Sequence, residues 1–249
     1  MNAIVVPVEG AELHVEVDGP AAGASVLLFS GARCTTRSWD PVIRMLTPRL
    51  RVIRHDIRGT GRSRAAEDAT YGLDQYAEDA AAILDHLDVE TTIAWGLAFG
   101  ARVAMAFASR YPARVRALAL FDASVEAPDT EAQRRGAELA RQQRAALGIP
   151  EVERDPSWFE HENPETLRKA LAAAYRDPDH RRYADGLRVP VLIATGDHDP
   201  NLPASERLQR MIPGAELVVL EAVGHGSALA RPQLCVEVFL DFLLRQGTV

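Results

Sequence analysis

The first candidate for chemistry is the run Gly96-Leu97-Ala98-Phe99-Gly100, which lies between a short β-branched run and an alanine-rich helical pattern. A strand, a tight turn flanked by glycines and a helix form the context in which a G-x-S-x-G motif presents a nucleophilic serine on a strained turn. The central residue of the motif is Ala98 in this chain. Because a methyl group cannot attack a carbonyl, the sequence predicts an acyl-transfer site that lacks its nucleophile.

A base and a carboxylate that orients it can be placed after later strands. His225 follows the last expected strand, and the glycines on both sides of it would let its loop reach over the edge of the sheet. Asp199 follows the expected strand 189–195 and is our preferred partner, while Asp197 in the same turn and Asp122 at the end of an earlier strand remain alternatives. A histidine held by a carboxylate is the general base that activates a hydroxyl nucleophile.

Two backbone amides are the candidates for an oxyanion hole. One is the N–H of Phe99, at the start of the expected helix, where the helix dipole favours negative charge. The other is the N–H of Ala32, in the loop after the expected strand 25–29. Both assignments rest on position, because backbone donors leave no side-chain signature.

The substrate-binding candidates are Arg33 and Trp158. Segment 126–186 contains many arginines, most of which we expect on a solvated helix face, so Arg33 is the better candidate to hold a carboxylate. We expect Trp158, with its neighbour Phe159, to be buried against the sheet domain and to wall the pocket. The predicted partner is a small molecule with an acyl ester or lactone. The sequence allows this substrate to be either anionic or neutral.

These residues need a scaffold, and strands alternate with helices over most of the chain. The alternation predicts an α/β fold with a mostly parallel sheet and helices on both faces. It is interrupted between residues 126 and 186, where the chain is charged, helical in period and broken by prolines. We therefore predict a core domain of residues 1–125 and 187–249 and a helical cap inserted as residues 126–186.

Composition excludes several classes of function. The 249 residues carry a formal net charge of −7, which argues against a nucleic-acid partner. The two cysteines have no metal-ligand spacing, and the sequence contains no cofactor or metal motif, no signal-peptide pattern and no apolar run long enough to span a membrane. We expect a cytoplasmic protein without cofactor, metal or membrane attachment, and nothing in the sequence sets its oligomeric state.

Five landmarks in order resemble the α/β-hydrolase fold family over essentially the whole chain: Ser30-Gly31, D-x-R-G-x-G-x-S at 56–63, the turn at 96–100, G-x-x-D-x-x-x-P at 196–203, and Gly224-His225. Within that family, the leading hairpin, Trp39-Asp40-Pro41 and the size of the cap are similar to the 3-oxoadipate enol-lactonase group. The resemblance implies a Ser-His-Asp mechanism with the order of nucleophile, acid and base, here 98, 199 and 225. Ser30 in place of histidine is a mild departure, and Ala98 in place of serine is a severe one.

Three hypotheses account for Ala98. In the first hypothesis, the alanine is an engineered replacement that leaves a serine hydrolase inactive. We favour this hypothesis because Asp199, His225 and both flanking glycines are intact. Alternatively, the alanine is natural, and His225 with Asp199 performs non-covalent acid–base chemistry, as in a lyase, decarboxylase or cyclase. The third hypothesis is a non-catalytic protein that binds a small molecule under the cap.

Overall fold

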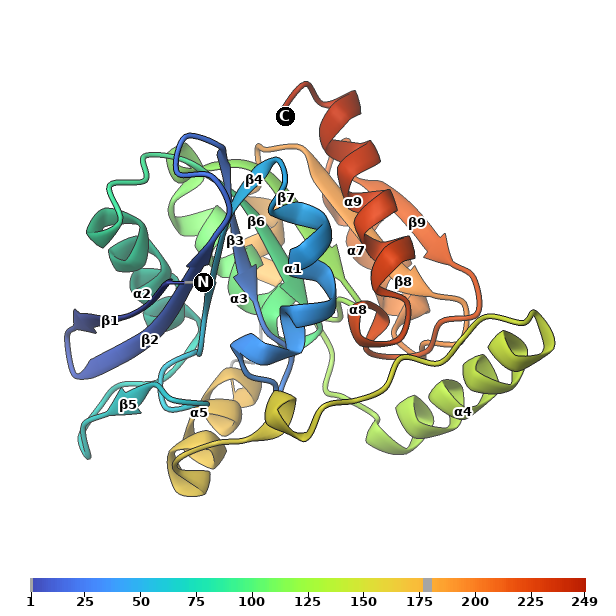
Figure 1. Cartoon of the computed structure of the whole chain (residues 1–249), viewed down its shortest axis with the longest axis horizontal. Coiled ribbons are helices and arrows are strands. Elements are labelled where there is room, and N and C mark those ends of the chain that lie inside the picture. The colour runs from blue at the N-terminus through green and yellow to red at the C-terminus, as the bar shows by residue number, and fades with distance from the viewer. Residues whose placement is uncertain (1, 177–180) are drawn as a thin grey trace.

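The chain is built around a central sheet, and the computed structural model describes it over residues 2–176 and 181–249 (Figure 1). The strands within these residues are β1 (Asn2–Val8), β2 (Ala11–Asp18), β3 (Ala24–Phe29), β4 (Leu50–His55), β5 (Arg64–Ala65), β6 (Thr92–Leu97), β7 (Val115–Phe121), β8 (Val191–Gly196) and β9 (Glu216–Leu220). Their order is β1-β2-β4-β3-β6-β7-β8-β9, and β5 pairs with β2. The sheet is antiparallel from β1 to β4 and parallel from β4 to β9. This confirms the predicted α/β fold with a mostly parallel sheet.

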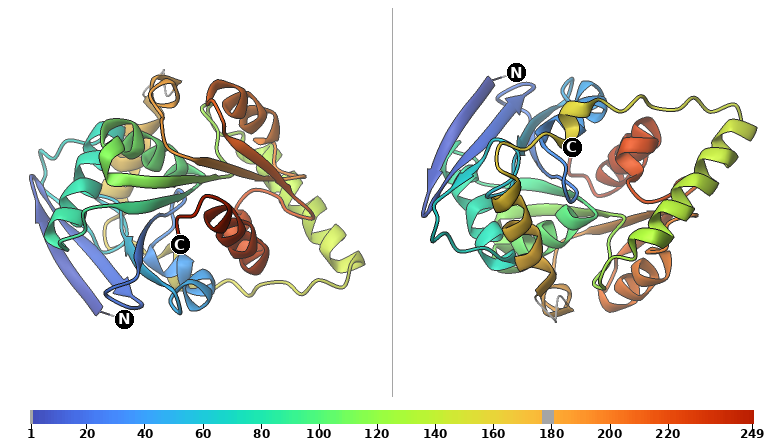
Figure 2. Two further views of the ribbon diagram at one scale, coloured as in Figure 1. Left: turned by 90° about the horizontal axis from the view of Figure 1, so that it is seen from above. Right: turned by 90° about the horizontal axis from the view of Figure 1, so that it is seen from below.

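Helices cover both faces of this sheet (Figure 2). One face carries α1 (Asp40–Leu46), α8 (Ser227–Ala230) and α9 (Pro232–Arg245), and the other carries α2 (Leu73–His86), α3 (Phe99–Arg110) and α7 (Leu202–Met211). Parallel strands covered on both faces are apolar throughout, and every residue of β6 is buried accordingly. No helix of the described ranges has the length and apolarity needed to cross a membrane.

Side chains of β6 alternate between two hydrophobic clusters, one on each face. Trp95 points to the face of α1 and α9, where its ring stacks on Phe239 with centroids 4.2 Å apart and meets Trp39 edge-on at 5.3 Å. Ala94 points to the opposite cluster, against α2 and α3. This packing fixes the carboxyl end of β6, from which the turn at Ala98 projects.

The segment between β7 and β8 contains α4 (Thr130–Ala146), a short 3-10 turn (Pro156–Phe159), α5 (Pro164–Arg176) and α6 (Arg181–Asp185). α4 and α5 lie at the edge where the parallel strands end (Figures 1 and 2). α5 is joined to the core by the hydroxyl of Tyr76, which donates to the carbonyl of Ala170 at 2.8 Å. α6 packs beside α3, so the assignment of residues 126–186 to a separate cap stays a prediction.

Candidate active site

The turn after β6 has the backbone of a nucleophile elbow. Ala98 has φ 53° and ψ −108°, a conformation that L residues rarely adopt, and its N–H donates to Phe121 O at 2.8 Å. Gly100 is required by close packing, because a Cβ there would lie 2.1 Å from the carbonyl oxygen of Phe29. α3 begins at the next residue, Phe99. The chain therefore retains the strained geometry that presents a nucleophile, with a methyl group in its place.

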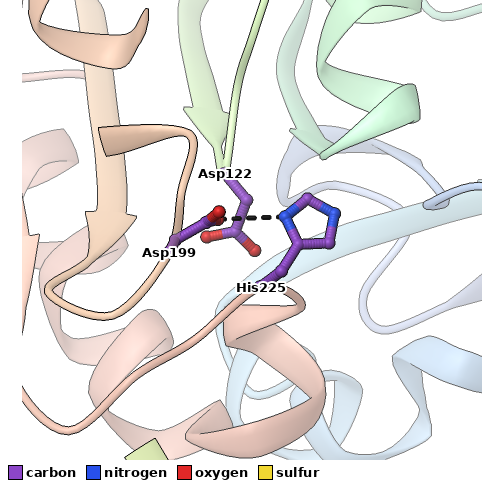
Figure 3. A group of neighbouring side chains, drawn as sticks. All are labelled: Asp122, Asp199 and His225. Carbon is purple, nitrogen blue, oxygen red and sulfur yellow. Dashed lines mark hydrogen bonds and ion pairs between the residues drawn. The ribbon is translucent and has the colours of Figure 1, made fainter. Parts of the chain in front are cut away.

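His225 and Asp199 form a hydrogen-bonded pair beside this turn (Figure 3). The distance between His225 Nδ1 and Asp199 Oδ2 is 3.0 Å, and the Asp199 side chain is completely buried. The other Asp199 oxygen accepts the N–H of Asn201 at 2.9 Å, which fixes the carboxylate in its loop after β8. An ionised carboxylate at Nδ1 favours a proton on that nitrogen, so the Nε2 of a neutral His225 carries the lone pair that a general base needs.

Asp122 completes the cluster from the end of β7 (Figure 3). Its Oδ2 accepts the N–H groups of Gly226 at 2.9 Å and Ser227 at 2.7 Å, so this carboxyl group holds the residues that follow His225. Its Oδ1 is buried without a hydrogen-bond partner among the described residues. Burial and the charge of Asp199 raise the pKa of the Asp122 carboxyl to about 7, against the opposing influence of His225 and Ser227.

Asp197 has a different task from the other two carboxylates. Its oxygens accept the N–H groups of Ala222 and Val223, both at 3.0 Å, and so shape the loop before His225. Of the three carboxylates considered from sequence, Asp199 contacts the imidazole, Asp122 contacts the residues after it, and Asp197 contacts residues before it. The contacts favour Asp199 as the acid.

The charges around His225 favour its protonated form. Burial lowers the pKa of the imidazole, but the hydrogen bond that the ring donates to Asp199 and the charges of Asp122 and Asp199 outweigh this effect, so the net shift is upward. One atom each of Asp122, Asp199 and His225 lies within 4.8 Å of the others, a spacing that one cation could bridge. The Nδ1 of His225 is already hydrogen-bonded to the Oδ2 of Asp199 in this cluster.

A cavity of about 740 Å³ opens in front of Ala98. It brings together the turn, the base and both predicted oxyanion donors, since Ala32, Phe99 and His225 line it with Ala98. Much of the remaining wall is apolar and comes from the segment between β7 and β8, including Pro128, Phe159, Pro164, Leu167 and Leu171.

The charged wall of the cavity is mostly basic. Arg33 lines it, together with Arg102, Arg154 and Arg168. Within the described residues no carboxylate forms an ion pair with Arg33, Arg154 or Arg168, whereas Glu126, an acidic residue of the same wall, pairs with Arg207.

Arg102 lies deeper in the same wall. It donates to the carbonyl of Glu126, and its guanidinium lies 5.2 Å from the centre of the Tyr175 ring. Burial raises the pKa of Tyr175, while the positive charges of Arg102 and Arg33 act to lower it, so both guanidinium groups act on the phenol. A cavity with this wall would favour a negatively charged ligand.

Trp158 does not line the cavity. Its side chain is 3% exposed and packs in the cluster that contains Trp39 and Trp95, whereas the adjacent Phe159 faces the cavity. Sequence reasoning also missed Arg102. Its position one helical turn after Ala98 was the available signal, because residues i and i+4 share a helix face.

Comparisons with known proteins show which family the chain resembles over its length. The family model described as the alpha/beta hydrolase fold matches residues 24–148. RutD of Variovorax paradoxus, provisionally named a carbamate hydrolase, is 32% identical over 94% of this chain and 96% of its own length. The 3-oxoadipate enol-lactonase 1 of Acinetobacter baylyi is 24% identical over 94% of both chains.

A solved structure shows the same fold over almost the whole chain. The enol-lactonase of Burkholderia xenovorans matches with a TM-score of 0.79 at 24% identity, covering 97% of this chain and all of that one. The chain therefore belongs to the α/β-hydrolase fold family. The resemblance to this family that the five sequence landmarks indicated is confirmed, and so is the similarity to enol-lactonase-like hydrolases that the leading hairpin and Trp39-Asp40-Pro41 indicated.

Proposed function

We propose that the chain is an α/β-hydrolase for a small acyl substrate, an ester or lactone, whose nucleophile position holds alanine, so that the form with this sequence is inactive in hydrolysis. The observation that carries the proposal is the elbow backbone at Ala98, retained beside the His225–Asp199 pair. The names of the relatives support an acyl substrate, since one acts on an enol-lactone and another is named for carbamates.

With serine at position 98, the site would work by acyl transfer. The Nε2 of His225 would take the serine proton while Asp199 stabilises the resulting imidazolium, and the serine oxygen would attack the substrate carbonyl. The amides of Phe99 and Ala32 would hold the oxyanion while the His225 imidazolium gives its proton to the leaving oxygen and the bond from that oxygen to the acyl carbon breaks. Water activated by the regenerated neutral His225 would then attack the acyl group and release it from the serine. Without the hydroxyl no acyl-enzyme forms, and loss of a nucleophile from such a site costs about six orders of magnitude in kcat.

We further propose that the substrate carries an anionic group. The support is the basic wall of the cavity, where the guanidinium groups of Arg33 and Arg102 both act on Tyr175. A carboxylate in the acyl or leaving group would meet these charges in a partly desolvated site, where a charge-assisted hydrogen bond is stronger than in water.

A second candidate function is non-covalent acid–base catalysis with a natural alanine at position 98. The observation that favours it is Asp122, a cavity-lining carboxyl group whose pKa is raised to about 7 by burial and by Asp199. Together with His225, whose pKa is raised by Asp199 and Asp122, it would supply a pair of groups that give and take protons, as a lyase or decarboxylase requires. A protein that only binds a small molecule in this cavity is the remaining alternative.

The deciding experiment compares the chain with its Ala98→Ser variant on short acyl esters, lactones, carbamates and a fluorophosphonate probe. The control is the double variant Ala98→Ser, His225→Gln, which keeps the hydroxyl but loses its base. Hydrolysis and labelling by the serine form alone would support the proposed hydrolase. If the serine form neither turns over nor labels, the proposal is wrong, and proton exchange at His225 and Asp122 becomes the next activity to assay.

A further inference from the structure

The turn that carries the Ala32 amide has an unfavourable backbone. The N–H of Cys34 donates to Gly31 O at 3.0 Å and closes the turn. Arg33, its third residue, has φ 61°, in the left-handed region that favours glycine. An arginine keeps this conformation only where its surroundings hold it there.

A side chain from the segment between β7 and β8 supplies that restraint. The Nε2 of His161 lies 3.0 Å from the carbonyl oxygen of Arg33, and its Nδ1 lies 2.7 Å from the N–H of Gly61. The imidazole thus connects the loop after β3 with the loop after β4. A backbone N–H can only donate, so Nδ1 must accept, and Nε2 must carry the proton that it donates to Arg33 O. The two contacts together define one neutral tautomer.

Main-chain bonds attach the same segment to these loops without involving the imidazole. The carbonyl of Trp158 accepts the Thr35 N–H at 2.8 Å, and the N–H of Glu162 donates to Gly61 O at 2.9 Å. These bonds do not depend on which side chain stands at position 161. The bond to Arg33 O, by contrast, is made by the imidazole alone.

Asp56 makes a second bridge between the two loops, at Thr36 in one and at Arg62, next to Gly61, in the other. This buried carboxylate accepts the Thr36 N–H at 2.8 Å through Oδ1 and the Arg62 N–H at 2.9 Å through Oδ2. The residues around Thr36 are therefore fixed independently of His161. Arg33 lies nearer the tip of its loop, where the imidazole makes the corresponding bridge.

We propose that His161 is a positioning residue that orients the turn bearing the Ala32 N–H and so prepares this amide for the oxyanion. The inference deepens the proposed function, and its kinetic consequence rests on that function. Its structural consequence, the orientation of the turn, does not require hydrolysis and can be measured in the chain with Ala98.

The structural test compares His161→Phe and His161→Gln by two-dimensional amide NMR of the chain with Ala98. Phenylalanine keeps a planar ring but removes both hydrogen bonds, whereas the glutamine amide offers one acceptor and one donor. We expect phenylalanine to shift the amide resonances of Ala32 and Gly61 and to speed hydrogen exchange at Gly61 at least tenfold, with glutamine close to the parent. His86→Phe, on the exposed end of α2, is the control for a general effect of the substitution. An unchanged Ala32 resonance in His161→Phe overturns the proposal.

The kinetic test introduces the same substitutions into Ala98→Ser. His161→Phe should lower kcat about tenfold and leave KM within twofold, because the amide acts on the oxyanion more than on the bound substrate. His161→Gln should recover at least half of the parental kcat. Equal losses in both variants, or a change confined to KM, contradict a positioning role. If Ala98→Ser itself is inactive, the proposed hydrolase fails, and the NMR comparison still decides whether His161 orients the turn.

Discussion

Asp199 Oδ2 lies 3.0 Å from His225 Nδ1, and the Asp199 carboxylate is completely buried while His225 is 23% exposed. The pair therefore joins a fixed inner carboxylate to an imidazole that reaches the cavity. A buried carboxylate without its hydrogen bonds would be costly, so the loop after β8 and the loop after β9 depend on each other for this contact.

The first prediction concerns the identity of the acid. In the Ala98→Ser background, Asp199→Asn should lower kcat by about four orders of magnitude, because an amide favours the wrong tautomer of His225. Asp197→Asn is the matched control, since Asp197 accepts from the backbone amides of Ala222 and Val223 and its Oδ1 lies 4.0 Å from the Nε2 of His198. It should cost stability but less than tenfold in kcat. Steady-state kinetics on a short acyl ester measure both, and a larger loss in the Asp197 variant would reverse the assignment.

The second prediction concerns the charge of the ligand. Arg33→Ala should weaken binding of an anionic ester by about tenfold, equivalent to roughly 1.4 kcal/mol, and change binding of the matching neutral ester less than twofold. Calorimetry on the chain with Ala98 can measure this directly, because the ligand is not consumed.

Arg116→Ala, an exposed change at the start of β7 and outside the cavity wall, controls for net charge. Equal effects of Arg33→Ala on both ligands would refute an anion-binding role for this arginine.

Much of the scaffold could be predicted from the sequence, because positions where two backbone segments come very close require glycine and such glycines can be recognised by their spacing. Gly100 and Gly196 are places where a Cβ would lie 2.1 Å and 2.0 Å from backbone oxygens of other segments. Such positions tolerate little besides glycine. The glycine spacing therefore indicates where the turn after β6 and the loop after β8 lie in the sequence. The alternation of apolar strands with helices supplied the sheet between them.

Side-chain direction outside regular elements could not be predicted in the same way. Trp158 and Phe159 are adjacent in a 3-10 turn, and one is buried in the core while the other faces the cavity. A turn of four residues is too short for a periodic sequence pattern to show which of the two side chains is buried. The contact of Asp122 with Gly226 and Ser227 spans more than a hundred positions. It depends on the pairing of β7 with β8 and of β8 with β9, which places the loops after β7 and β9 at one edge of the sheet, and not on any local pattern.

The third prediction uses the raised pKa of Asp122, about 7 in the folded chain against 3.8 ordinarily. The folded state holds this proton more tightly than the unfolded state, so the contribution of Asp122 to stability falls as pH rises from about 4 to 7. Asp122→Asn removes the ionisation and keeps an oxygen that can accept from Gly226 and Ser227. Relative to the parent, its free energy of unfolding should therefore increase by about 2 kcal/mol between pH 5 and pH 8.

Urea unfolding at the two pH values measures this difference. Asp68→Asn, at an exposed position, should show no such increase and serves as the control. If the two variants behave alike, Asp122 is ionised in the folded protein at neutral pH, and the second candidate function loses the observation that favours it.

The last prediction tests whether close packing at the elbow is as tight as its geometry indicates. Gly100→Ala would place a Cβ 2.1 Å from Phe29 O, and because that oxygen belongs to the backbone of β3, relief requires α3 to move from the sheet. We expect a loss of about 3 kcal/mol in the free energy of unfolding. Gly148→Ala is the matched control, because the added Cβ would meet no atom within 4 Å. Its only expected effect is the backbone strain of an alanine at φ 68°, about 1 kcal/mol. Thermal unfolding should separate the two variants by several degrees. Equal melting temperatures would show that the elbow can relax around a larger side chain. The proposed mechanism would then lack support, because it depends on a fixed position of residue 98.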